Sequence, residues 1–277
     1  MMKVGHTGTL DPLASGVLPL VLGRATRLAQ FLSSAEKEYE ADVRLGVSTT
    51  TFDRAGEPLN DPCARGVSEL TLSDIQEALS ELRGSYLQQP PVFSAKKVDG
   101  DRAYDLARKN EPVPLEPSQV TAHTLDIIEW TGEHLRLRLV CSPGFYVRSL
   151  AQAIGQRLGT GAHLAGLVRT RSGDFRLDAA VTLGDLDQHP DQAAAKVILL
   201  SQLLPELPAV TLTEKGASLA ARGGFISPGH VTGAQAFPAA GRVRLLHPDG
   251  HLVAIAEPSV ARSGRASGLL HPGVVLD

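Results

Sequence analysis

The chain has 277 residues, of which 43% are apolar and 21% charged, and its formal net charge is −3. This length suggests roughly two domains, and the apolar content is enough to bury a sizeable core, so an intrinsically disordered chain is excluded. The longest apolar run, residues 17–22, contains a proline and falls far short of the roughly 18 residues that a membrane span needs. No basic-then-apolar leader follows Met1, and two cysteines do not suggest a disulfide framework, so the sequence predicts a protein of the reducing cytoplasm.

The predicted elements of the first half alternate helix and strand. Apolar residues three and four apart predict a helix over residues 24–33, and alternation with period two predicts a strand over residues 39–45. Residues 48–66 are polar and rich in turn formers, which indicates a loop. Ser73 and Gln76 form a capping-box signature and predict a helix that ends near Gly84.

The second half supplies most of the predicted sheet. Residues 121–130 and 134–141 are typical of an antiparallel pair joined by a short turn, residues 146–158 of a helix, and residues 164–175 of a returning strand. Beyond these, residues 213–222 predict a short helix, and a His-Pro-Asp-Gly turn at 247–250 predicts a hairpin. We therefore expect an α+β fold with a mixed, largely antiparallel sheet and flanking helices in residues 1–200. Residues 207–277 are expected to form a small β-rich domain.

The charged residues are unevenly distributed along the chain. Residues 1–35 contain one acid, Asp11, and residues 142–173 contain four arginines and no acid, whereas residues 36–83 contain eleven acids against five lysines or arginines. This segregation favours a basic face that attracts a polyanion, although ordinary surface scatter explains it equally well.

Residues 5–16 combine glycines and threonines with the dipeptide Asp11-Pro12. Asp-Pro is typical of the start of a helix, so Asp11 is either a helix cap or a functional carboxylate in a loop that lets a ligand approach the backbone closely. The nine histidines are scattered, and neither His163 nor Cys141 has a partner at metal-ligand spacing, so no metal site is expected.

The order of several motifs carries a family resemblance. Residues 6–18, His-Thr-Gly-Thr-Leu-Asp-Pro-Leu-Ala-Ser-Gly-Val-Leu, resemble the catalytic motif of the TruB-type tRNA pseudouridine synthases, which isomerise the T-loop uridine at position 55. Four further segments resemble this family in the same order: residues 37–46, residues 89–97 with Tyr104, residues 141–150 and residues 161–173. Residues 207–276 resemble a PUA-type RNA-binding domain.

This resemblance implies roles for six residues. Asp11 would be the essential aspartate and Arg148 its partner, because an arginine offsets the cost of burying a carboxylate. The other four would contact the substrate: Tyr39 stacks on the uracil, Leu167 lines the base pocket, Tyr146 lies near the pocket, and His6 occupies space left by rearranged T-loop bases.

The resemblance also implies the partners and the chemistry. The substrate would be the T-arm of a tRNA, bound by a monomer in the cytoplasm, with no DNA or membrane partner. The uridine would be flipped into a cleft that holds Asp11, at a cost of a few kcal/mol. Isomerisation needs neither a metal nor a redox cofactor, and Asp11 would act either as a nucleophile or by abstracting a ribose proton.

Two alternatives to a pseudouridine synthase remain at this point. The first is a catalytically impaired tRNA-binding or RNA-folding protein that uses the same surface. The second, a two-carboxylate glycosidase, is less favoured because no second acid lies in a suitable motif. Family members carry a few tens of residues before the aspartate motif, so we expect either that Met1 is not the natural start or that the chain is impaired.

Overall fold

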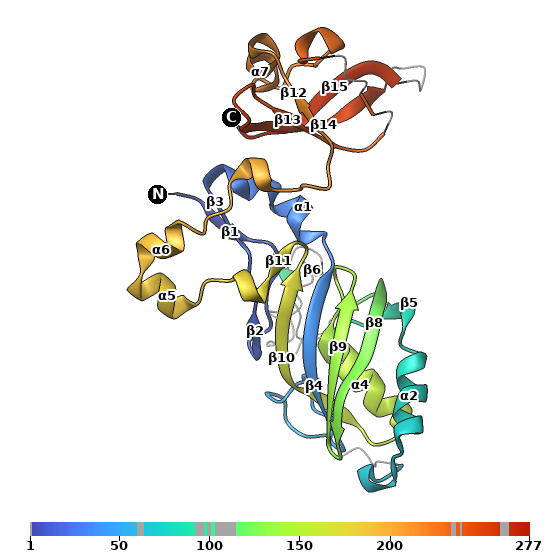
Figure 1. Cartoon of the computed structure of the whole chain (residues 1–277). Helices are drawn as coiled ribbons and strands as arrows, with labels where there is room; N and C mark the ends of the chain where they lie inside the picture. The colour runs from blue at the N-terminus through green and yellow to red at the C-terminus, as the bar shows by residue number, and fades with distance from the viewer. Residues whose placement is uncertain are drawn as a thin grey trace. The chain divides into compact units, whose positions relative to one another are not determined.

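The computed structural model describes residues 2–59, 64–91, 97–98, 101–102, 115–233, 237–238, 240–260 and 266–277 (Figure 1). The chain divides into two compact units: one comprises Met1–Thr7, Leu20–Leu32 and Val181–Asp277, and the other comprises Gly8–Pro19 and Ser33–Ala180. Each unit has a hydrophobic core of its own. The expected domains at residues 1–200 and 207–277 stay a prediction. Within the described ranges, no helix has the length and apolar character to cross a membrane.

The unit made of Gly8–Pro19 and Ser33–Ala180 is built on a seven-stranded sheet. Its strands are β2 (Ala14–Gly16), β4 (Lys37–Leu45), β5 (Gly84–Gln88), β8 (Ser118–Thr131), β9 (His134–Cys141), β10 (Ala162–Ser172) and β11 (Phe175–Arg176). Their order is β11-β10-β4-β9-β8-β5, with β2 pairing with β10. Only the β2–β10 pair is parallel among these pairings. The expected α+β fold with a mixed, largely antiparallel sheet is confirmed.

Alternation along β9 gives the centre of this sheet one dry face. Three leucines of β9 have no exposed surface, and the arginines between them project from the opposite face. Arg136 and Arg138 form ion pairs with Glu40 and Glu38 of β4 at 3.4 and 2.9 Å. Because exposed ion pairs contribute at most about 1 kcal/mol each, burial of the leucines is the main stabilising contribution here.

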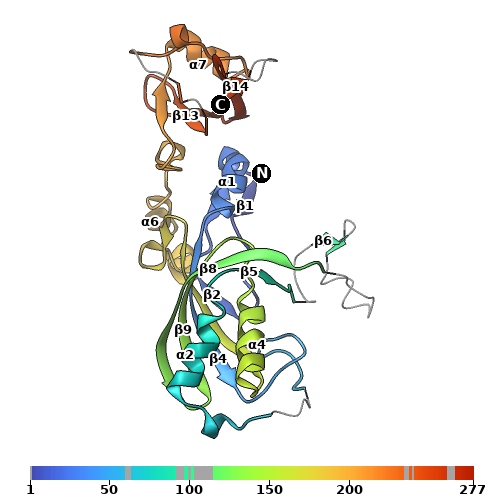
Figure 2. The same cartoon turned by 90° about the vertical axis from the view of Figure 1, so that its right-hand side faces the viewer.

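Two helices cover the apolar face, α2 (Leu72–Ser80) and α4 (Val147–Leu158), and Figure 2 shows both on the same side of β4 and β9. Their buried residues, such as Ile75 of α2 and Ile154 of α4, belong to the same core cluster as the leucines of β9. The expected helix at 146–158 and the strands at 39–45, 121–130 and 134–141 are confirmed. The remaining short elements of this unit are η2 (Val67–Glu69), β6 (Lys97–Val98), β7 (Asp101–Arg102) and η3 (Leu177–Ala179).

The N-terminus of α2 differs from the expectation. Thr71 is the cap: its hydroxyl accepts the Asp74 N–H at 3.3 Å, and the Asp74 carboxylate accepts the Thr71 N–H at 2.7 Å. The expected capping box of Ser73 and Gln76 is therefore wrong. Asp74 also forms an ion pair with Arg65 at 3.0 Å, a tertiary contact that favours the earlier start.

The other unit contains a four-stranded sheet in the order β12-β13-β14-β15. Its elements are β1 (Val4–His6), β3 (Leu20–Leu22), η1 (Gly23–Leu28), α1 (Ala29–Ser33), α5 (Leu183–Gln188), α6 (Pro190–Ala194), η4 (Leu200–Gln202), β12 (Ala209–Thr211), α7 (Glu214–Ala220), η5 (Pro228–His230), β13 (Val243–Leu246), β14 (Leu252–Val260) and β15 (Ala266–Val275). The helix expected at 213–222 and the hairpin around 247–250 are confirmed as α7 and β13–β14. Arg24 and Arg27 of η1 donate to the carbonyls of Leu276 and Val275, which links the two ends of the chain within this unit.

Candidate active site

The loop that carries Asp11 is held by one buried arginine. Arg169, 1% exposed, donates its Nε–H to the Val17 carbonyl at 2.6 Å and its Nη2–H to the Gly8 carbonyl at 3.0 Å. The Val17 N–H in turn donates to the Arg169 carbonyl at 2.9 Å. A guanidinium that satisfies carbonyls at both ends of a loop limits the movement of the residues between them.

Gly16 makes this close approach possible. Its φ is +102°, and a Cβ at this position would lie 2.2 Å from the Arg169 carbonyl oxygen. Any other residue would therefore clash with the backbone of β10 and would also be strained by the positive φ. The glycine of the motif has a local steric reason that is independent of any ligand.

Asp11 does not begin a helix. Its carbonyl accepts the Ala14 N–H at 2.8 Å in a turn, and the chain then enters β2, which pairs with β10 at Leu167 opposite Ala14. The helix-start interpretation of Asp11-Pro12 is wrong because pairing with β10 overrides the local preference of this dipeptide. The side chain of Asp11 is thus left for tertiary contacts.

Arg148 binds the Asp11 carboxylate with both arms of its guanidinium. Nε donates to Oδ2 and Nη2 donates to Oδ1, each at 2.9 Å. The Arg148 side chain is 6% exposed and that of Asp11 is 29% exposed. Such a two-point contact fixes the plane of the carboxylate, and the exposed part of Asp11 remains accessible to a ligand.

The position of Arg148 follows from how α4 begins. Tyr146 is the N-cap, and its backbone is held by the Gln88 side chain, which accepts the Tyr146 N–H at 2.8 Å and donates to the Tyr146 carbonyl at 3.0 Å. Arg148 follows two residues later, in the first turn. The predicted site residue Tyr146 thus lies next to the ion pair along the chain, and its backbone fixes the start of the helix.

A second carboxylate, which the sequence did not predict, lies at this site. Asp53 is 8% exposed, and its Oδ2 lies 3.7 Å from Arg148 Nε. Its Oδ1 accepts the Thr51 hydroxyl at 2.7 Å and the Ala55 N–H at 2.9 Å, so the carboxylate is firmly positioned. Asp53 lies in the polar loop 48–66, where an acid carries no sequence signal. Arg148 therefore faces two carboxylates, and the second of them comes from outside every motif recognised in the sequence.

Tyr39 and Leu167 lie on neighbouring strands of the same unit. Tyr39, on β4, is opposite Arg169 of β10, and Leu167 of β10 is opposite Ala41 of β4. Burial raises the pKa of the Tyr39 hydroxyl above its ordinary value of 10.0, and the charge of Arg169 opposes the shift. Tyr39 is therefore a neutral phenol at physiological pH. Leu167 is 6% exposed within the core cluster, so packing alone accounts for its position.

The remaining predicted positions lie elsewhere. His6 ends β1 in the other unit and pairs with Leu20 of β3. Tyr104 and most of residues 89–97 lie outside the described residues.

Two arginines of the acid-free segment 142–173 that lie outside the site form ion pairs within the protein. Arg157 and Arg171, in the acid-free segment, form ion pairs with Glu81 at 3.0 Å and with Glu38 at 3.2 Å. Arginines of the acid-free segment thus pair with acids of the acid-rich segment, so the uneven charge distribution in the sequence does not by itself indicate a surface that attracts a polyanion.

Two family models match this chain, and together they cover residues 1–207. A model described as "TruB family pseudouridylate synthase (N terminal domain)" matches residues 1–147. A second, described as "tRNA pseudouridylate synthase B C-terminal domain", matches residues 148–207.

Proteins named tRNA pseudouridine synthase B match this chain over most of its length. A tRNA pseudouridine synthase B from Solibacter usitatus is 45% identical over 276 residues, which are 99% of this chain and 90% of that protein. Another, from Francisella philomiragia, is 38% identical over 257 residues, 92% of this chain and 82% of that protein. Among solved structures, one described as "Crystal structure of the archaeal box H/ACA sRNP Nop10-Cbf5 complex" matches with a TM-score of 0.69 and 25% identity, over 99% of this chain and 77% of that chain.

Proposed function

Because the chain belongs to the TruB family of pseudouridylate synthases, we propose that it converts the uridine at position 55 of the tRNA T-loop to pseudouridine. The observation that supports this most directly is the two-point contact between Arg148 and Asp11 at 2.9 Å. It orients a partly exposed carboxylate in a loop whose backbone is held by Arg169.

The reaction is a rearrangement of the nucleoside itself. The C1′–N1 bond breaks and a C1′–C5 bond forms, and the proton lost from C5 is balanced by one gained at N1, so no co-reactant is consumed. Asp11 acts on the ribose of the flipped nucleotide, and Arg148 stabilises and orients its charge. Tyr39 stacks on the uracil. Because its hydroxyl is neutral, Tyr39 acts in proton handling as a hydrogen-bond donor or through transient deprotonation.

The proposal extends to the substrate and the domains. A T-loop already contains unstacked bases, which lowers the cost of flipping the target uridine. Residues 1–200 would carry the chemistry, and residues 207–277 would act as a PUA-like RNA-binding domain, in a protein that works as a cytoplasmic monomer. Arg242 forms an ion pair with Glu257 at 2.7 Å, so RNA binding by this domain would have to compete with an existing contact.

The test measures release of tritium from C5-labelled uridine in transcribed tRNA. The wild-type chain should release one tritium per tRNA, and a transcript with cytidine at position 55 should release none. The Asp11→Asn variant should release none while its affinity for tRNA stays within about tenfold, because removing a negative charge does not weaken attraction to phosphate. Asp126→Asn, which changes an exposed acid of β8, is the matched control.

The outcomes separate the alternatives. Turnover by Asp11→Asn would contradict the assignment of Asp11. Tight tRNA binding by the wild-type chain without tritium release would favour the non-catalytic RNA-folding protein.

A further inference from the structure

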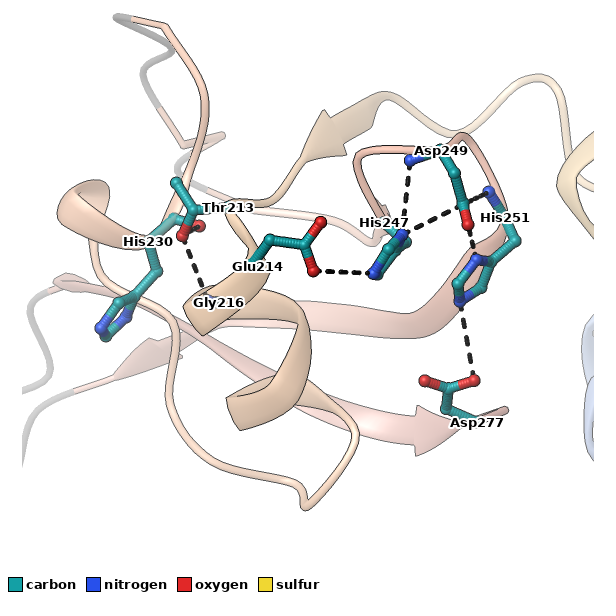
Figure 3. Close-up of polar contacts among 8 residues, drawn as sticks. All are labelled: Thr213, Glu214, Gly216, His230, His247, Asp249, His251 and Asp277. Carbon is teal, nitrogen blue, oxygen red and sulfur yellow. Dashed lines mark hydrogen bonds and ion pairs between the residues drawn. The ribbon is translucent and has the colours of Figure 1, made fainter.

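The turn between β13 and β14 brings together three side chains of the types that serve as metal ligands in proteins. His247 Nδ1 lies 3.1 Å from Asp249 Oδ1, and His251 Nδ1 lies 2.6 Å from the same oxygen (Figure 3). One ligand atom from each residue lies within 4.8 Å of the others, and this is the one group of three such residues in the described part of the chain. It is independent of the proposed tRNA chemistry.

The backbone of the hairpin holds the two histidines side by side. The His247 N–H donates to the His251 carbonyl at 2.9 Å, and the Gly250 N–H donates to the His247 carbonyl at 2.9 Å. Gly250 has a φ of +92°, which closes the turn. The imidazole rings consequently stack, with centroids 4.5 Å apart and planes inclined by 19°. In this arrangement both Nδ1 atoms lie close to the same oxygen, Asp249 Oδ1.

A second layer of carboxylates lies behind the histidines. Glu214 Oε2 is 3.3 Å from His247 Nε2, and Asp277 Oδ1 is 3.6 Å from His251 Nε2 (Figure 3). At His247, a carboxylate at Nε2 favours the tautomer with its proton there, which leaves the Nδ1 lone pair for a metal, whereas His251 Nδ1 donates to Asp249 Oδ1 at 2.6 Å in the absence of a metal. The Asp249 N–H at 3.3 Å from His247 Nδ1 fits this tautomer, because the N–H needs an acceptor.

Charge at the cluster also favours a cation. Three carboxylates surround two imidazoles, and Arg24, 3.5 Å from Asp277, balances one of them. The side chains of His247, Asp249 and His251 are 22%, 62% and 45% exposed, so an ion can reach them without opening of the fold.

We propose that His247, Asp249 and His251 bind a divalent transition-metal ion of the Zn²⁺ class. Two imidazole nitrogens and one carboxylate oxygen suit this class, and water completes a tetrahedral shell. Ligands about 2.0–2.2 Å from Zn²⁺ lie roughly 3.4 Å apart, so the two distances from the histidine Nδ1 atoms to Asp249 Oδ1, 3.1 and 2.6 Å, need to lengthen by less than about 1 Å. His251 gives up its hydrogen bond to Asp249 on binding. The ion ties the end of β13 to the start of β14, a structural role at a position where the sequence predicted no metal site.

The experiment uses the full chain, stripped of metal and with any affinity tag removed. Zn²⁺ is titrated by calorimetry, and Co²⁺ is added separately because its visible absorption reports tetrahedral nitrogen and oxygen ligands. We expect one ion per chain and a higher melting temperature with Zn²⁺. The double variant His247→Gln/His251→Gln should lose at least about tenfold in affinity together with the Co²⁺ absorption.

Two further variants make the test specific. Glu214→Gln keeps all three ligands and alters only the carboxylate behind His247, so it should weaken binding about tenfold. His134→Gln is the matched control, because His134 faces a single carboxylate, Asp42, at 3.0 Å, and should change nothing. Equal Zn²⁺ binding by the wild type and the double variant, or an equal loss in His134→Gln, would overturn the proposal. If the double variant misfolds by circular dichroism, unchanged affinity in Glu214→Gln would overturn it.

Discussion

The two-point contact between Arg148 and Asp11 can be tested without removing its charge. Arg148→Lys keeps a cation in place but replaces the forked guanidinium with a single ammonium, which reaches one carboxylate oxygen instead of two. The structure has two hydrogen bonds at 2.9 Å, so one is lost. A hydrogen bond to a charged group contributes about 1.5–3 kcal/mol, and a loss near 2 kcal/mol in the transition state corresponds to about a 30-fold slower reaction.

The assay is single-turnover tritium release at saturating enzyme. Since the contact orients Asp11 and lysine keeps the positive charge, we expect the rate to fall about 30-fold while the affinity for tRNA changes less than about threefold. The melting temperature should change by only a few degrees, because the buried carboxylate of Asp53 still has a cation nearby.

Arg157→Lys is the matched control for this experiment. Arg157 lies on the same helix and contacts one carboxylate, Glu81, at 3.0 Å, with 34% of its side chain exposed. Its turnover should equal that of the wild type. A rate within twofold of wild type in Arg148→Lys would refute the argument that the geometry of the pair matters, and so would an equal loss in Arg157→Lys.

The other predictions concern the second carboxylate, the loop and the core. Asp53→Asn removes the second charge facing the active-site arginine and should slow single-turnover tritium release roughly tenfold, about 1.4 kcal/mol in the barrier; an unchanged rate would make this residue a loop anchor only. Gly16→Ala places a Cβ 2.2 Å from the Arg169 carbonyl and should cost about 3 kcal/mol or more in urea unfolding, against about 1 kcal/mol for Gly144→Ala, whose φ is +81° but whose Cβ meets nothing within 4 Å. Burial raises the pKa of the Cys141 thiol from 9.0 to about 12. The contribution of the neutral thiol to the free energy of unfolding is therefore intact below pH 9 and is lost as the pH rises from 9 to about 12, by roughly 4 kcal/mol in total. The free energy of unfolding, measured with urea, should therefore fall more steeply from about pH 8 to about pH 11 for the wild type than for Cys141→Ala. Parallel curves would show that the Cys141 thiol does not have a raised pKa.

Local patterns in the sequence were sufficient to predict four strands of the sheet, β4, β8, β9 and β10, but not the short strands β2 and β5. Strand β9 alternates leucine with arginine or histidine, and helix α4 places its apolar residues on one face, because side-chain burial follows the repeat of the backbone. The order of the motifs identified the family, and with it the pairing of Asp11 and Arg148. These statements depend on residues close in sequence, or on a pattern retained by relatives.

Contacts between distant segments were decided only by the tertiary structure. Asp11-Pro12 has the local chemistry of a helix start, yet strand pairing with β10 makes it a turn. Asp53 faces Arg148 across 95 residues of sequence, and a polar loop gives no indication of that approach. Arg169 is a charged residue that the fold buries completely because three carbonyls of one loop accept its protons. Periodicity encodes which face of an element is buried, whereas the partner of a buried charge depends on where the folded chain brings its carboxylates and carbonyls.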